Sequence, residues 1–235
     1  NVGFDHASGP WLFGGDFAYA ENRQKMEQEV FKGNSHAYGL DLYATYRADN
    51  GGYADFVVSG RRNHQHLTTV MLDGVGVKGS YRNTGYGASI EVGRLMTVSE
   101  KHDVFFEPQA QLAYFAVQGK DFVLSNGFTV RQKDYESLTG RIGGVLGKNF
   151  TSQETGRFGE VALHAGWKGN LFARNGVTVN DVPFSDRLLH NRFYYGVSGY
   201  VTHGENLAFY AYAEREKGQG YAKAFEAGIG MKYRF

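Results

Sequence analysis

The sequence predicts an all-β fold, a transmembrane antiparallel up-and-down β-barrel with about eleven strands visible in this chain. Apolar and polar residues alternate along these segments, and the connections between segments are alternately short and long. The last segment, residues 225–235, is apolar on one side, polar on the other, and ends in a bare aromatic residue. Lipid-facing and lumen-facing side chains alternate in this way in outer-membrane barrels. We therefore expect residues 1–235 to form one outer-membrane domain.

The expected strands follow one another along the whole chain. They cover residues 1–7, 11–20, 37–47, 53–62, 85–95, 104–117, 137–150, 157–168, 192–202, 207–216 and 225–235. Side chains on one face of a strand recur every second residue. We expect each strand to present one apolar face to lipid and one polar face to the lumen.

Three strands illustrate the two faces. Trp11, Phe13, Phe17 and Tyr19 share one face, with Asp16 on the other. In the third strand the corresponding sets are Tyr38, Leu40, Leu42 and Tyr46 against Asp41, Thr45 and Arg47. In the eighth strand they are Val161, Leu163 and Trp167 against Glu160 and His164. A soluble β-sandwich would also alternate, but the loop rhythm and the aromatic terminus favour the barrel.

The connections indicate the orientation. Residues 8–10, 48–52, 96–103, 151–156 and 203–206 are short connections rich in turn-forming residues. Residues 21–36, 63–84, 118–136 and 169–191 are long polar connections. Outer-membrane barrels have short periplasmic turns and longer extracellular loops. The alternation therefore predicts extracellular long connections and a periplasmic carboxyl terminus.

Composition agrees with a barrel and excludes several other classes. Mean hydropathy is −0.43, and no run approaches the roughly 18 apolar residues of a membrane helix. The net charge of +1 and the dispersed basic residues give no basis for nucleic-acid binding. The chain has no cysteine, which excludes disulfides and thiolate metal sites. No signal peptide is present, so we expect a mature form or a fragment.

Two features predict local departures from a regular closed barrel. Bacterial single-chain barrels have an even number of strands, so we expect at least one further strand before Asn1. Pro108 lies inside the sixth strand, where it removes a backbone donor. A bulge or local break is therefore expected beside Glu107.

Several motifs resemble those of a known family, in its order and spacing. They are Tyr86–Arg94 (YGASIEVGR), Phe106–Tyr114 (FEPQAQLAY), Ser125–Gly127 (SNG), Ser137–Gly143 (SLTGRIG), Leu207–Ala211 (LAFYA), Lys217–Tyr221 (KGQGY) and Tyr233–Phe235 (YRF). The chain resembles the β-barrel translocator domain of autotransporters, the type V secretion proteins of Gram-negative bacteria. The resemblance implies a twelve-stranded barrel that anchors an amino-terminal passenger, with a linker helix threading the pore. The passenger, the helix and the first strand are absent from this chain.

Nine polar residues are the candidate lumen-lining and linker-contacting residues. They are Asp16, Asp41, Asp55, Glu91, Glu107, Gln109, Gln111, Arg141 and Glu160. A basic side chain facing lipid at the bilayer midplane would cost about 2–4 kcal/mol, and an acidic one somewhat less, so these residues should point inward. They could contact the linker helix and the passing polypeptide, or they could form a mutually satisfied ladder without a passenger contact.

The terminal strand resembles the family's assembly signal, carried by Gly230, Tyr233 and Phe235, with Gly228 where a polar residue is usual. Assembly machinery could pair with this strand by β-augmentation. The alternative is that the aromatic residues only anchor the interface. The expected partners are the passenger and linker helix, the outer-membrane assembly machinery, periplasmic chaperones and the lipid bilayer.

We expect no enzyme activity, no cofactor and no metal site. His64, His66, His102, His164, His190 and His203 are the candidate catalytic or ligating histidines. Their spacing matches neither a triad nor a metal site, and the His64 and His66 pair lacks a third ligand. A general diffusion porin and an outer-membrane hydrolase remain the alternatives to a translocator.

Overall fold

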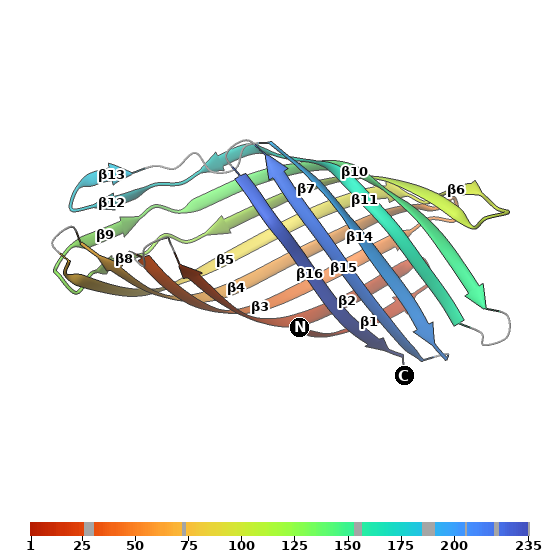
Figure 1. The fold of residues 1–235 in the computed structure, drawn as a ribbon, viewed down its shortest axis with the longest axis horizontal. Helices are drawn as coiled ribbons and strands as arrows, with labels where there is room; N and C mark the ends of the chain where they lie inside the picture. The colour runs from red at the N-terminus through yellow and green to blue at the C-terminus, as the bar shows by residue number, and fades with distance from the viewer. Residues whose placement is uncertain are drawn as a thin grey trace.

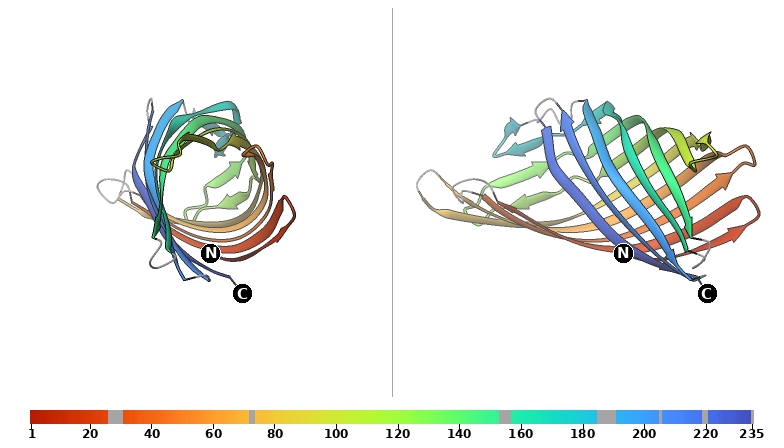
Figure 2. Two further views of the ribbon diagram at one scale, coloured as in Figure 1. Left: turned by 90° about the vertical axis from the view of Figure 1, so that its right-hand side faces the viewer. Right: turned by 45° about the vertical axis from the view of Figure 1, so that its right-hand side comes forward.

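The computed structural model describes residues 1–25, 31–71, 74–152, 157–184, 191–204, 206–218 and 221–234. Within them, one antiparallel sheet follows the order of the chain and curls around a central axis (Figures 1 and 2). The path runs β1-β2-β3-β4-β5-β7-β10-β11-β14-β15-β16, and β6 pairs with β7 beside it. The prediction of about eleven up-and-down strands is confirmed.

The strands of this sheet have the following bounds: β1 (Val2–Ser8), β2 (Trp11–Lys25), β3 (Phe31–Arg47), β4 (Gly52–Val70), β5 (Gly76–Arg94), β6 (Met96–Ser99), β7 (Val104–Val117), β10 (Tyr135–Ser152), β11 (Arg157–Arg174), β14 (Arg192–His203), β15 (Leu207–Gly218) and β16 (Tyr221–Tyr233). Among the described residues no helix is long and apolar enough to cross a bilayer.

The first and last strands form the two edges of the curled sheet. In the described part of the chain, no backbone ladder joins β1 to β16. An ion pair links them instead, because Lys232 Nζ lies 2.7 Å from Asp5 Oδ2. Tyr43 Oη donates a hydrogen bond of 3.4 Å to the same carboxylate oxygen.

A second, four-stranded sheet lies at one end of the curled sheet, which we call the loop end (Figure 1). It consists of β8 (Asp121–Val123), β9 (Thr129–Gln132), β12 (Val177–Val179) and β13 (Val182–Phe184). These strands come from the predicted long connections 118–136 and 169–191, so these are partly ordered as sheet. The opposite end, with the short connections, is the turn end.

The strands near the loop end are longer than predicted. Residues 21–36 and 63–84 were expected to be connections, but β2 extends to Lys25, β3 begins at Phe31, β4 extends to Val70 and β5 begins at Gly76. The ladders continue without a register shift, with Glu21 opposite His36 and His64 opposite Arg82. Because the outer face becomes polar there, the sequence lacks the apolar alternation that marks the rest of each strand.

The predicted break beside Glu107 is confirmed. The β5–β7 ladder ends at the pair Gly93 and Gln109, and pairing resumes only at Met96 and Phe106 in β6. On its other side β7 pairs continuously with β10, with Pro108 opposite Gly144. The proline therefore interrupts one ladder, where its missing donor would otherwise be needed.

The predicted faces are confirmed by exposure. On the outer face Leu163 is 59% and Ile142 64% exposed, whereas inward Ala162 and Tyr194 are 1% and 2% exposed. Glycines let inner aromatic rings lie flat on the neighbouring strand. A methyl group on Gly147 would clash with the ring of Phe105.

Candidate functional site

The inner wall collects the polar side chains that the sequence singled out. The nine predicted residues are all partly buried and alternate with exposed apolar residues along their strands: Asp16, Asp41, Asp55, Glu91, Glu107, Gln109, Gln111, Arg141 and Glu160. Their strands run from β2 to β11. Their contact with a linker or a moving polypeptide stays a prediction.

Glu91 is the centre of the first polar cluster. Glu91, Gln111 and Arg141 stand in one row across β5, β7 and β10. Arg141 forms an ion pair with Glu91. Tyr53 Oη lies 2.8 Å from Glu91 Oε1 and 3.0 Å from Glu107 Oε1. The Tyr53 phenol thus bridges the two carboxylates, and the Arg141 guanidinium neutralises Glu91.

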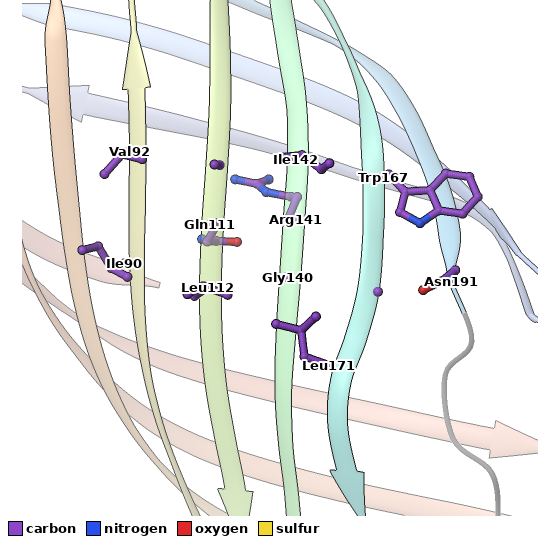
Figure 3. Close-up of a pocket in the computed structure, with 12 residues that line it drawn as sticks. Ile90, Val92, Gln111, Leu112, Gly140, Arg141, Ile142, Trp167, Leu171 and Asn191 are labelled. Atoms are coloured by element: carbon purple, nitrogen blue, oxygen red, sulfur yellow. The ribbon is translucent and has the colours of Figure 1, made fainter.

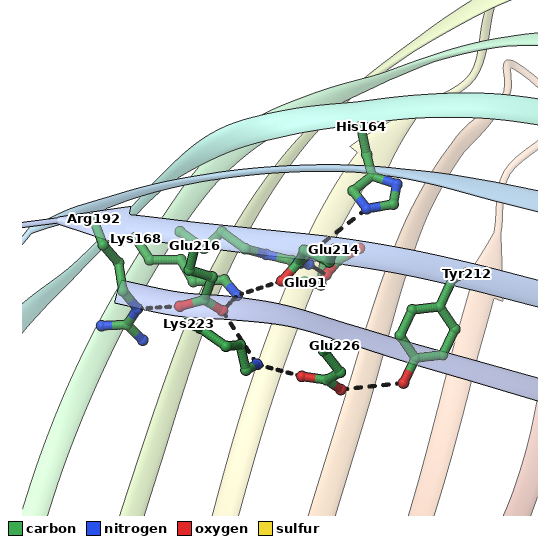
Figure 4. Close-up of polar contacts among 10 residues, drawn as sticks. Glu91, His164, Lys168, Arg192, Tyr212, Glu214, Glu216, Lys223 and Glu226 are labelled. Atoms are coloured by element: carbon green, nitrogen blue, oxygen red, sulfur yellow. Dashed lines mark hydrogen bonds and ion pairs between the residues drawn. The ribbon is translucent and has the colours of Figure 1, made fainter. Parts of the chain in front are cut away.

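A second cluster surrounds Glu216 on β15 (Figure 4). Lys168 Nζ donates to Glu216 Oε1 at 2.6 Å, and Arg192 Nε donates to Glu216 Oε2 at 2.6 Å. Glu216 is 4% exposed, so two cations neutralise a buried carboxylate. Lys168 Nζ also lies 4.8 Å from the centre of the Tyr194 ring, and Arg141 Cζ lies 5.8 Å from it. Tyr194 therefore connects the two clusters.

The network continues to the last strand. Lys168 Nζ lies 3.3 Å from Glu214 Oε1. Lys223 lies 3.8 Å from Glu216 and forms an ion pair with Glu226, which accepts a 3.1 Å hydrogen bond from Tyr212 Oη. Polar contacts therefore cross the inner wall from β4 to β16.

Three of the predicted acidic residues lie on β2, β3 and β4. Asp16 stands directly opposite Asp41, an arrangement of like charges that destabilises a sheet. Arg61 offsets it with an ion pair of 2.6 Å to Asp41. Asp55 accepts a 2.5 Å hydrogen bond from Thr45 Oγ1.

An inner cavity of about 830 Å³ adjoins Asp55. The side chains that line it include Tyr53, Asp55, Glu91, Glu107 and Glu160. Within the described wall this part of the lumen is therefore predominantly acidic.

The sequence identified the first cluster better than the second. Alternation would have placed Glu214 and Glu216 on the inner face, since they are even-numbered like inward Tyr212. Lys168 and Arg192 lie at the ends of predicted strands, on either side of the predicted long connection 169–191. Their shared contact with Glu216 depends on the register of three strands, which one sequence does not reveal.

The outer wall is apolar and slightly hollowed. A hollow of about 520 Å³ crosses β5, β7, β10 and β11 (Figure 3). Ile90, Leu112, Ile142 and Leu171 surround Gly140, which has no side chain to fill the space. Such a surface suits lipid chains and leaves the charged groups to the inner wall.

The terminal strand places its glycines under tyrosines of β15. A methyl group on Gly228 would clash with the ring of Tyr212, and one on Gly230 with that of Tyr210. Tyr233 pairs with Leu207, and its side chain is 54% exposed. Phe235, the last residue of the predicted assembly signal, lies outside the described residues.

The histidines in the described part of the chain are not grouped into a metal site. Among the described residues, no three His, Asp or Glu side chains are grouped to hold a metal ion. The rings of His64 and His66 are 4.2 Å apart on the outer face. His164 Nε2 lies 3.6 Å from Glu214 in the inner wall. His190 lies outside the described residues.

Comparison with known proteins agrees with this geometry. The family described as autotransporter beta-domain matches residues 1–214. The pertactin autotransporter of Bordetella bronchiseptica is 30% identical over 99% of this chain, which corresponds to 25% of that protein. The chain thus spans about a quarter of the relative's length.

Two solved structures have the same fold. The translocator domain of the autotransporter NalP from Neisseria meningitidis has a TM-score of 0.85 at 16% identity, covering 100% of this chain and 79% of that one. The β-domain of the Bordetella autotransporter BrkA has a TM-score of 0.79 at 23% identity, covering 99% and 87%.

Proposed function

The chain belongs to the autotransporter β-domain family, and from this membership we propose that it carries an amino-terminal passenger across the outer membrane. It is an outer-membrane translocator domain rather than an enzyme. The observation that carries the proposal is the sorting of side chains into an apolar outer wall and a continuous polar inner wall. The length of the relatives is consistent with a passenger, since this chain corresponds to only a quarter of the pertactin autotransporter.

In the proposed orientation, the turn end faces the periplasm and the loop end faces the outside of the cell. Short turns on one end and long strand extensions on the other support this orientation. The carboxyl terminus, after β16, would then be periplasmic.

In the proposed mechanism, the inner wall binds the linker and lines a passive conduit for the polypeptide. It supplies no energy for transport. Arg141 neutralises Glu91, and Glu107 accepts hydrogen bonds from Tyr53 and Gln109. A polypeptide in the lumen can exchange hydrogen bonds with this wall while the ion pair of Arg141 and Glu91 stays intact. The acidic cavity beside Glu160 would favour a basic segment of the linker.

We also assign assembly to the terminal strand. Among the described residues no ladder joins β16 to β1, so assembly machinery would pair with this edge by β-augmentation. Periplasmic chaperones would hold the apolar outer face before insertion. Deleting Phe235 in the full-length protein should lower insertion into the outer membrane in cells. Unchanged insertion would mean that the terminal aromatic residue only anchors the strand at the membrane interface.

Two epitope insertions test the orientation. One enters the turn at Gly127 in the small sheet, and the other enters the turn at Gly51. Antibodies should bind the first on intact cells and the second only after permeabilisation. The reverse pattern would contradict the orientation.

The transport role needs its own experiment. In the full-length protein, an epitope in the passenger should be accessible to protease on intact cells. A passenger that stays protected, together with sugar uptake by vesicles that contain the protein, would indicate a diffusion porin instead.

A further inference from the structure

Beyond the apolar band, β3, β4 and β5 carry basic residues on their outer face, whereas Glu21 lies on the outer face of β2 opposite His36. Residues 31–38, 61–70 and 76–85 contain no Asp or Glu. Arg62, His64 and His66 on β4 and Lys78 and Arg82 on β5 share the parity of the exposed Val58 and Tyr86. We call these five residues the basic outer face.

The inner face of the same stretch differs. Asn63 donates a 3.1 Å hydrogen bond to Asn83, and Gln65 stands opposite Tyr81. The one inward cation, Arg61, is neutralised by Asp41 at 2.6 Å. If water alone surrounded this part of the sheet, basic residues would be expected equally on both faces. Their concentration on the outer face therefore requires another reason.

The two arginines are close enough to share one anion. Arg62 is opposite Thr84 and Arg82 is opposite His64, so the two arginines are diagonal neighbours. Such neighbours are about 7–8 Å apart on a sheet. Two guanidinium groups at this spacing can both reach the oxygens of one phosphate, which they recognise by paired hydrogen bonds.

The neighbouring basic groups of this face also oppose protonation of His64. Desolvation, followed by the charges of His66, Arg82 and His36, lowers the pKa of His64 below its usual value. An anion over this face would relieve the same repulsion.

The basic outer face begins beside three exposed outward tyrosines, Tyr19, Tyr38 and Tyr86, which we call the aromatic belt. Arg62 stands directly opposite Tyr38, whose ring lies 5.3 Å from that of Tyr19. Tyr86 stands opposite Gly60, two pairs nearer the turn end than Arg62 and Thr84. Aromatic residues of this kind mark the level of the lipid headgroups. The arginines thus lie at the height of the headgroups and point away from the lumen.

We propose that the basic outer face binds the phosphate groups of a lipid in the outer leaflet of the outer membrane. The inference rests on the proposed orientation, which places the loop end in that leaflet. A lipid phosphate fits better than free phosphate, because the apolar band below Arg62 can hold the acyl chains of the same molecule. The site would fix the height of the barrel in the membrane.

The test measures lipid retention by the full-length protein in nanodiscs of phosphatidylcholine. Diphosphoryl lipid A is added as the probe, and bound lipid is measured by native mass spectrometry. Retention should weaken roughly tenfold in Arg62→Gln/Arg82→Gln, because each basic side chain adds attraction to anionic headgroups. Arg62→Lys/Arg82→Lys should keep most of it. The matched control is Arg94→Gln, an exposed arginine on the outer face of β5 at the turn end.

The proposal would be overturned if the double glutamine variant retained as much lipid as the unmodified protein. It would also be overturned if Arg94→Gln lost as much lipid as the double glutamine variant. Competition by inorganic phosphate at the lipid concentration would also overturn it, because the site would then bind free phosphate. Heat-modifiable gel mobility checks that each variant is folded. Nanodiscs offer the lipid on both sides, so a failure of the proposed orientation or transport would leave this measurement unaffected.

Discussion

Replacing Leu163 by Arg tests the assignment of the outer face to lipid. Leu163 is 59% exposed on β11, and its partners Leu146 and Val197 are also exposed. It therefore lies within the apolar band, where a basic side chain costs about 2–4 kcal/mol at the midplane. At about 1.4 kcal/mol per factor of ten, the ratio of folded to unfolded protein should fall roughly 30- to 700-fold.

The assay is urea-dependent folding into phosphatidylcholine vesicles, followed by gel mobility with and without heating. Ser89→Arg is the control, because Ser89 is five residues from the turn end of β5 and Leu163 six residues from that of β11. Ser89 faces inward between Val57 and Ala113, toward the acidic groups of the lumen. Ser89→Arg should change the free energy of unfolding by less than about 1 kcal/mol. Equal losses in both variants would refute the assignment of the faces.

Two further substitutions test packing and charge inside the wall. Gly147→Ala should destabilise the fold by about 1–3 kcal/mol in urea titration, because its methyl group would displace the ring of Phe105. Gly60→Ala, with open space around it, should have little effect, and an equal loss there would contradict the packing argument. Glu216→Ala should cost about 1.5–3 kcal/mol, since it removes the carboxylate that the partly buried Lys168 and Arg192 share. Lys217→Ala, on the outer face of the same strand, should be near neutral, and the reverse order would contradict the position of the cluster.

Strand number, strand order and faces could be predicted from the sequence because the bilayer imposes them. Leu163 and His164 differ in polarity because one meets lipid and the other the lumen, and this contrast repeats every second residue. The contrast disappears beyond the membrane. For this reason the extensions at Glu21 and His64 looked like loops, although their backbone ladders continue.

The candidate site was predicted only in part, for a different reason. Periodicity shows which face a side chain occupies but not which distant strand lies beside it. Glu91 and Arg141 were recognised as inward, and their ion pair follows from a register across β7. The cluster around Glu216 brings together strands separated by long connections, so only the structure could reveal it.

The central claim is that lipid surrounds one face of this sheet and water the other. The chain has no cysteine, so single cysteines can be introduced one at a time from residue 160 to residue 168 on β11 and labelled with a nitroxide. In reconstituted membranes, odd positions should be accessible to oxygen dissolved in lipid and even positions to a water-soluble relaxation agent. Uniform accessibility, or the opposite phase, would contradict the account.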